Sequence, residues 1–193
     1  MDIKLVASDL DGTIMDRNNF IPDITFKAIN TLHEKNINFV VCTGKSYSVS
    51  KNICKNFNAG YGIFGNGAQI IDFKNGKELN RKILSSEQIN YCIKLARKEN
   101  LHIHFYTENT VVTENLKYMD LRNYILKEKN SSELKFFIVP NIEKFIKEEN
   151  PSIFSLVITS DNSMEEFEKI IQKNLSVSTN LISKKGIYKD TII

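Results

Sequence analysis

Short apolar runs alternate with stretches of helical spacing in the opening part of the chain. Each run is followed by a polar loop, and the runs are Ile3–Ala7, Ile37–Cys42 and Tyr61–Phe64. Between them, apolar residues at helical spacing predict two helices, at Asp23–Lys35 and Val49–Phe57. This order predicts βαβ units and a parallel sheet, whose functional edge is the carboxyl end of its strands. The sequence therefore favours an α/β fold for this part, with the three polar loops at one edge.

The pattern changes after the third run. Ile70–Phe73 and Lys77–Leu79 flank Asn75-Gly76, which predicts a β-hairpin. Beyond it, helices and strands of an α+β unit are expected, and two helices begin with capping-box signatures, Ser85-Ser86-Glu87-Gln88 and Ser163-Met164-Glu165-Glu166. The expected helices are Ser85–Lys98, Leu116–Lys129, a short one that follows Pro140 and ends near Glu149, and Ser163–Leu175. The expected strands are His102–Thr107, Val111–Thr113, Leu134–Val139, Ile153–Thr159 and at least one after Ser176.

Composition excludes several classes of protein. Of the 193 residues, 41% are hydrophobic and 25% are charged, which predicts a folded chain with a real core. The net charge of +3 is weak evidence for nucleic-acid binding, and no apolar run approaches the roughly 18 residues of a membrane span. The start of the chain lacks the order of a signal peptide, and the widely spaced Cys42, Cys54 and Cys92 are expected to be reduced thiols. We therefore expect a cytoplasmic protein.

Two carboxylates directly after the first predicted strand carry the strongest chemical signal. Asp9 and Asp11 repel each other unless a cation compensates their charge, and an oxygen-only site suits Mg²⁺. Asp9 could attack phosphorus while Asp11 transfers protons, and Gly12 permits the turn that follows. A helix cap is a poor alternative because the first predicted helix starts more than ten residues later. A calcium loop is also poor, because Ile14 stands where that loop has glycine.

The segment Asp9-Leu10-Asp11-Gly12-Thr13 resembles the DxDGT signature of the haloacid dehalogenase superfamily of phosphohydrolases. Val40-Val41-Cys42-Thr43-Gly44-Lys45 resembles the second motif of that superfamily, and its pairing with Gly65-Asn66-Gly67-Ala68 looks like the Cof-type (IIB) branch. The resemblance implies a Rossmann-like parallel-sheet core with an inserted α+β cap. The corresponding boundaries are 1–81 for the first part of the core, 82–183 for the cap, and 184–193 for a strand that returns toward the rest of the core.

The resemblance also implies roles for five residues. Asp9 would be the nucleophile that becomes an aspartyl-phosphate, and Asp11 would protonate the leaving alcohol and then activate water. Mg²⁺ would bind the Asp9 carboxylate and the Asp11 main-chain carbonyl. The Leu10 N–H, the Thr43 hydroxyl and the Gly44 N–H would hold the phosphate, near a helix N-terminus that favours anions.

Some family features differ or are absent. The Cof-type branch usually has arginine after the Thr-Gly pair, where this chain has Lys45, which keeps the charge but loses the bidentate fork. A late Lys motif is matched only faintly, by Lys185, and the late acidic motif that completes the metal site does not occur. The chain is therefore expected to be a truncated phosphatase that lacks the C-terminal half of the core.

Two other patterns are set aside. Gly60-Tyr61-Gly62-Ile63-Phe64-Gly65 matches GxGxxG but lies on a predicted strand, whereas a dinucleotide site needs this motif to open a helix. His102 and His104 would share one face of a strand, where a half-buried surface is a commoner role than metal binding.

The expected function is Mg²⁺-dependent hydrolysis of a small phosphomonoester, such as a sugar phosphate, through an aspartyl-phosphate. The alternatives are a truncated, non-catalytic protein that only binds phosphate, and a phosphomutase. The expected partner is a small phosphorylated metabolite, and neither nucleic acid nor a membrane.

Overall fold

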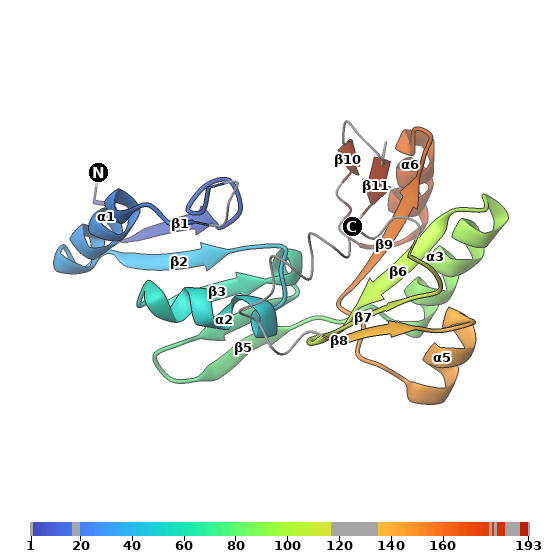
Figure 1. The fold of residues 1–193 in the computed structure, drawn as a ribbon, viewed down its shortest axis with the longest axis horizontal. Coiled ribbons are helices and arrows are strands. Elements are labelled where there is room, and N and C mark those ends of the chain that lie inside the picture. Colours follow the sequence, from blue (N-terminus) through green and yellow to red (C-terminus); the bar gives the residue numbers. More distant parts are fainter. Residues whose placement is uncertain are drawn as a thin grey trace. The chain divides into compact units, whose positions relative to one another are not determined.

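The computed structural model describes residues 2–16, 20–116, 135–177, 179, 181–183 and 190–192. The chain forms two compact units, and among the described residues the boundary falls between Lys82 and Ile83 (Figure 1). The expected boundary lay one residue earlier. That the two units act as core and cap stays a prediction.

The first unit contains a five-stranded sheet and two α-helices. Its strands follow the order β1-β2-β3-β4-β5, with parallel pairing among β1, β2 and β3 and antiparallel pairing from β3 to β5. The elements are β1 (Leu5–Asp9), α1 (Asp23–Glu34), β2 (Asn38–Cys42), α2 (Tyr47–Asn56), β3 (Tyr61–Phe64), the 3₁₀ turn η1 (Gly65–Gly67), β4 (Gln69–Asp72) and β5 (Lys77–Arg81). The predicted βαβ units and the hairpin are therefore confirmed.

The hairpin turn is held by one carboxylate. Asp72 accepts hydrogen bonds from the Lys74 and Asn75 N–H groups, at 2.9 and 3.1 Å, and from the Asn75 side chain at 2.7 Å. These hydrogen bonds lower the pKa of Asp72, and the bond from the Asn75 side chain has the largest effect. Gly76 then adopts a φ of +61°, which a residue without a side chain adopts without strain.

The parallel strands end level with one another. The ladder pairs Asp9 with Cys42 and Cys42 with Ile63. One residue further, the Thr43 N–H donates to the Ile63 carbonyl at 2.9 Å. The three loops that follow these strands therefore start at the same edge of the sheet, as the sequence predicted.

Strand β1 is an edge strand among the described strands of its sheet, and it is unusually exposed for a parallel strand. Leu5 is 50% exposed and the preceding Ile3 is 58% exposed, although both are apolar. Most buried residues of this unit instead come from the loop after β1 and from the neighbouring elements, among them Leu10, Met15, Phe39, Phe57 and Phe64. The core of the first unit is therefore less closed on the β1 side than in the middle of the sheet.

The second unit contains a six-stranded sheet with the order β10-β11-β9-β6-β7-β8. Only β7 and β8 pair in parallel, and the other described pairs are antiparallel. Its elements are α3 (Ser86–Lys98), β6 (His102–Tyr106), β7 (Thr110–Thr113), β8 (Lys135–Ile138), α5 (Ile142–Glu149), β9 (Ser155–Ser160), α6 (Glu165–Asn174), β10 (Leu181–Ser183) and β11 (Asp190–Ile192). The helix predicted at Leu116–Lys129 lies, from residue 117 onward, outside the described residues.

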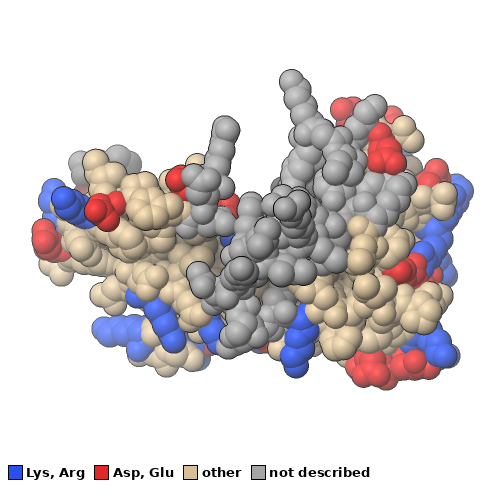
Figure 2. Space-filling view, viewed as in Figure 1, with Lys and Arg blue, Asp and Glu red and all other residues tan. Residues whose placement is uncertain are grey.

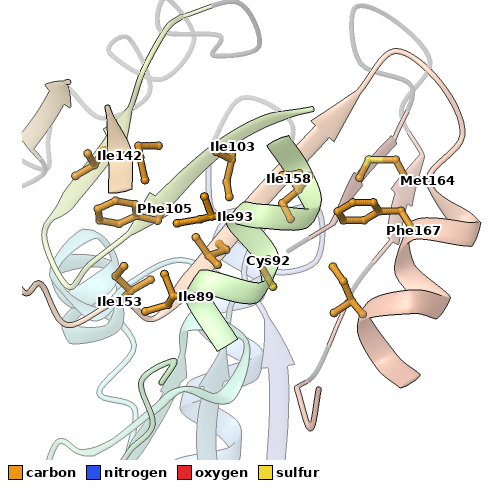
Figure 3. Packing of buried hydrophobic residues seen from close by; sticks show 14 of the residues in the cluster. Ile89, Cys92, Ile93, Ile103, Phe105, Ile142, Ile153, Ile158, Met164 and Phe167 are labelled. Atoms are coloured by element: carbon orange, nitrogen blue, oxygen red, sulfur yellow. The ribbon is translucent and has the colours of Figure 1, made fainter. Parts of the chain in front are cut away.

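One face of this sheet is packed against helices. Figure 3 shows Ile89 and Ile93 of α3 near Ile103 and Phe105 of β6, and these four side chains are at most 4% exposed. Helices α5 and α6 add further apolar residues to the same cluster. Burial of each large aliphatic side chain contributes roughly 1.5–3 kcal/mol, so this cluster is the main source of stability in the second unit.

The two capping boxes have different outcomes. Ser85 is the N-cap of α3, and its hydroxyl oxygen accepts a hydrogen bond from the Gln88 N–H at 3.2 Å. The Ser85 N–H in turn donates to Gln88 Oε1 at 2.8 Å. The box predicted at Ser163 is wrong, because the N-cap of α6 is Met164, whose side chain does not cap the helix with a hydrogen bond. Met164 is 1% exposed, so its insertion into the core sets where the helix begins.

Part of the last segment of the chain is described. That the segment 184–193 returns toward the rest of the core stays a prediction. Its described strand β11 pairs antiparallel with both β9 and β10, so residues 190–192 belong to the sheet of the second unit. Pairing with β9 satisfies backbone N–H and C=O groups of β11. The sequence pattern does not show which strand β11 pairs with.

Candidate functional site

The loop after β1 is held in place by one carbonyl and three apolar side chains. The Leu10 carbonyl accepts the N–H groups of Thr13, Ile14 and Met15 at 3.4, 3.1 and 2.8 Å. Leu10, Ile14 and Met15 are at most 4% exposed and belong to the core of the first unit. Asp9 and Asp11, by contrast, are exposed. The buried residues therefore fix the loop while both carboxylates face solvent.

Gly12 lets the loop turn directly after the second carboxylate. Its φ is +76°, in the left-handed region, and its N–H donates to the Met15 carbonyl at 2.9 Å. A side chain at this position would strain the backbone. The glycine of the signature thus has a local structural reason.

The loop after β2 presents Thr43 and Gly44 just before helix α2 begins at Tyr47. Thr43 is buried, and its hydroxyl oxygen accepts the Lys45 N–H at 3.2 Å. The hydroxyl proton is then available to an anion. Because the N-terminus of a helix carries partial positive charge, this arrangement favours a bound phosphate.

The loop after β3 approaches the loop after β2 closely. Asn66 adopts a φ of +54°, and its Oδ1 lies 2.8 Å from the position that a Cβ on Gly44 would occupy. The Gly65 N–H also donates to the Lys45 carbonyl at 2.9 Å. Asn66 therefore lies against the loop of Thr43 and Gly44, a contact that the sequence did not predict.

Lys45 links the first two loops through its side chain. Its Nζ donates to Asp11 Oδ1 at 3.0 Å, and the two side chains are 30% and 47% exposed. The sequence left the contact of this lysine open. The structure shows that its partner in the described part of the chain is one of the two predicted catalytic carboxylates.

The Asp9 carboxylate affects the pKa of Cys42, the last residue of β2. Burial raises the pKa of the Cys42 thiol, and the nearby Asp9 carboxylate raises it further. A raised pKa leaves less of the thiol as the reactive thiolate, which disfavours Cys42 as a nucleophile. Cys42, Cys54 and Cys92 are all free, as expected.

The oxygens at this edge are of the kind that Mg²⁺ prefers. Asp9 and Asp11 offer carboxylate oxygens. The N–H groups of Thr13, Ile14 and Met15 donate to the Leu10 carbonyl and not to the Asp11 carbonyl. Among the described residues, no three side chains of His, Cys, Asp or Glu form a group that could hold a metal ion. The donors therefore fit Mg²⁺ in their chemistry, with only two carboxylates contributed by the described part of the chain.

The structure brings the predicted residues Asp9, Leu10, Asp11, Thr43 and Gly44 to one edge of one sheet. Lys185 lies outside the described residues.

The GxGxxG match lies on β3 and leads into the antiparallel strand β4, as expected. A side chain on Gly62 would collide with the Phe64 and Phe73 rings, so packing explains that glycine.

Charges of both signs lie close together at one helix of the second unit. Figure 2 shows acidic and basic atoms beside one another around α5, and that helix carries both Glu143 and Lys147 at its ends. In the described part of the chain, no helix has the length and apolar character that a membrane span requires.

Comparison with known proteins gives three groups of similar sequences and structures. A profile of the haloacid dehalogenase-like hydrolase family matches residues 6–192. A candidate phosphatase of Buchnera aphidicola is 30% identical over 74% of this chain and 58% of its own length. A 5-amino-6-(5-phospho-D-ribitylamino)uracil phosphatase of Bacillus subtilis is 30% identical over 58% of this chain and 45% of its own, and an HMP-PP phosphatase of Yersinia pestis is 29% identical over 58% and 41%. The chain spans about half the length of the curated relatives it matches, between 41% and 58% of each.

Solved structures share the fold at low sequence identity. A phosphatase of the same superfamily from Bacteroides thetaiotaomicron has a TM-score of 0.73 at 19% identity, covering 98% of this chain and 66% of that chain. A subclass IIB sugar phosphatase has a TM-score of 0.67 at 16% identity, covering 98% and 69%. The fold, the two carboxylates of the first loop and the family match across nearly all of its length agree: this chain belongs to the haloacid dehalogenase-like hydrolase family.

Proposed function

We propose that the first unit carries the nucleophile and the phosphate loop of a phosphatase that acts on small phosphomonoesters. The observation that carries the proposal is the level ending of β1 and β2, which places exposed Asp9 and Asp11 beside the loop of Thr43 and Gly44. The named phosphatases among the relatives support a small phosphorylated metabolite as substrate.

In the proposed reaction, a carboxylate oxygen of Asp9 attacks phosphorus, and the bond from phosphorus to the leaving alcohol breaks. Asp11 gives a proton to the oxygen of that alcohol. Asp11 then takes a proton from a water molecule, whose oxygen attacks the aspartyl-phosphate and releases inorganic phosphate. The Leu10 and Gly44 N–H groups and the Thr43 hydroxyl hold the phosphoryl oxygens throughout.

The Asp9 carboxylate and the Asp11 main-chain carbonyl would hold Mg²⁺. When bound there, the ion supplies positive charge that offsets the repulsion between the Asp9 carboxylate and the phosphate.

Phosphate release from a panel of phosphomonoesters tests the proposal. Asp9→Asn is expected to lower the rate by about a thousandfold or more while the circular dichroism spectrum is unchanged, because an exposed nucleophile is removed and no core is disturbed. Asp23→Asn, which removes an exposed carboxylate at the start of α1, is the matched control and is expected to keep the rate. EDTA should abolish the reaction and a zinc-selective chelator should not. Retention of most activity by Asp9→Asn would contradict the aspartyl-phosphate mechanism.

Binding without turnover is the second candidate, because the described residues contain no group of three His, Cys, Asp or Glu side chains that could hold a metal ion. Calorimetry with phosphosugars and Mg²⁺ beside the release assay separates the two functions. A phosphomutase would yield isomerised sugar phosphate in place of free phosphate.

A further inference from the structure

Lys45 is tied to all three loops of the candidate site. Its N–H donates to Thr43 Oγ1, its carbonyl accepts the Gly65 N–H, and its Nζ donates to Asp11 Oδ1 at 3.0 Å. Two of these three bonds use backbone atoms, so the start of the side chain is fixed. The ammonium group therefore reaches Asp11 from a rigid base.

The ion pair has little value for stability. Both side chains are partly exposed, and ion pairs of this kind contribute about 0–1 kcal/mol. The pair instead joins residues 34 positions apart, across the edge where the phosphate is expected. The ion pair therefore holds the Asp11 carboxylate close to the loop after β2, which carries Thr43.

Lysine and arginine hold a carboxylate in different ways. A guanidinium would grip a carboxylate with two parallel bonds, whereas an ammonium makes a single point contact and keeps two other N–H donors. A carboxylate held by one bond is oriented and can still rotate to transfer a proton.

We propose that Lys45 is a positioning residue of the phosphatase site, which acts through Asp11 by holding its carboxylate at the edge shared with Thr43. The proposal rests on the proposed function, since it assigns Lys45 to the acid–base step of the same site. It predicts an effect on kcat, because proton transfer depends on geometry. It predicts no change in the affinity for phosphate, because the ammonium does not act as the phosphate ligand.

Kinetics on the full chain test the proposal. Lys45→Met is expected to lower kcat by about tenfold to a hundredfold. The inhibition constant of inorganic phosphate should stay within twofold of the unchanged chain. Lys45→Arg, which keeps a positive charge beside Asp11 but holds the carboxylate with two bonds, should restore kcat only in part. Lys55→Met, which removes a lysine from the last turn of helix α2, away from the loop of Lys45, should leave kcat and the inhibition constant unchanged. An unchanged kcat with weaker phosphate binding would overturn the proposal and make Lys45 a phosphate ligand.

A double-mutant cycle shows whether Lys45 acts through Asp11. In the Asp11→Asn background, Lys45→Met should change the single-turnover rate by less than twofold. A further tenfold loss in that background would overturn the proposal.

A measurement without turnover separates this proposal from the proposed function. The side-chain carboxyl ¹³C resonance of Asp11 should shift in Lys45→Met and stay in Lys55→Met, whether or not the chain hydrolyses a phosphomonoester. An unshifted resonance would overturn the ion pair and with it the proposal. A shifted resonance in a chain without any turnover would overturn the proposed function alone.

Discussion

His104 is buried on β6 beside groups that cannot neutralise a positive charge. Its ring lies 5.5 Å from that of His102 and 5.4 Å from that of Tyr106, measured between centroids. Its ladder neighbours are Val157 of β9 and Thr113 of β7. Among the described residues, no group forms a hydrogen bond with its Nδ1. Burial, and to a smaller extent the neighbouring His102 imidazole, lowers the pKa of His104 to about 3.

The low pKa of His104 predicts an acid-sensitive fold. The unfolded chain takes up a proton on this imidazole near pH 6.5, whereas the folded chain does so only near pH 3. Stability from neutral His104 is therefore complete above pH 6.5 and declines as the pH falls toward 3. The expected loss between pH 7 and 5 is about 2 kcal/mol. Denaturant unfolding at both pH values measures it, and His104→Gln should remove most of the difference. An NMR spectrum that shows a charged His104 imidazole in the folded protein at pH 5 would contradict the prediction.

Helix α3 is joined to α5 and to the end of β7 by one arginine. Arg97 donates to both Glu143 carboxylate oxygens, at 3.1 and 2.8 Å, and to both Glu114 oxygens, at 2.8 and 2.5 Å. Glu114 also accepts the N–H of Ile142, the first residue of α5, at 2.8 Å. This network is more than a surface pair, because the guanidinium makes several directed bonds and Glu114 is only 18% exposed.

We predict that Arg97→Met destabilises the protein by about 1–3 kcal/mol at pH 7, because two carboxylates lose their partner. Burial raises the pKa of Glu114, but hydrogen bonds from Arg97 and the Ile142 N–H outweigh it and lower the pKa overall; Arg97 is also the main cause of the lowered pKa of Glu143. Lowered carboxylate pKa values stabilise the fold above the unfolded value near 4.5. The loss should therefore shrink as the pH falls below about 4.5.

Urea unfolding at pH 7 and at low pH measures this loss, with Lys98→Met as the control because Lys98 is largely exposed on the same helix. An equal loss at both pH values would show that Arg97 acts only through packing.

Most elements were predictable because they depend on local patterns. The period of apolar residues located the strands and helices within a few residues, and Asn75-Gly76 located the hairpin. The start of α6 was missed because burial of Met164 outweighs the capping preference of Ser163. The contact between Lys45 and Asp11 joins two loops far apart in sequence, and only the register of β1 and β2 brings them together. The pairing of β11 is likewise a long-range property.

At the scale of the whole molecule, the two units differ in how fully their sheets are enclosed. Strand β6 lies between two described neighbours, and Ile103 and Phe105 on it are at most 2% exposed. Strand β1 pairs only with β2 among the described strands, and Leu5 on it is half exposed. Local opening therefore costs less free energy at β1 than at β6.

Hydrogen exchange of the full chain should show this difference. Amides of β1 are expected to exchange at least about tenfold faster than those of β6, because edge strands open without global unfolding. Strand β2 is the matched control, since it belongs to the same sheet and has a neighbour on each side. It should exchange more slowly than β1. Equal protection of β1 and β6 in a monomer would contradict the prediction.

The loop after β1 divides its residues into two sets. The side chains of Leu10, Ile14 and Met15 belong to the hydrophobic core of the first unit, whereas those of Asp9 and Asp11 make no contribution to it. Natural selection can therefore alter the two carboxylates at little cost to folding. A lineage could lose the proposed reaction, or exchange it for binding of an anion without turnover, and still inherit the same scaffold. A descendant that changed Leu10 would not have this freedom, because its folding would fail first.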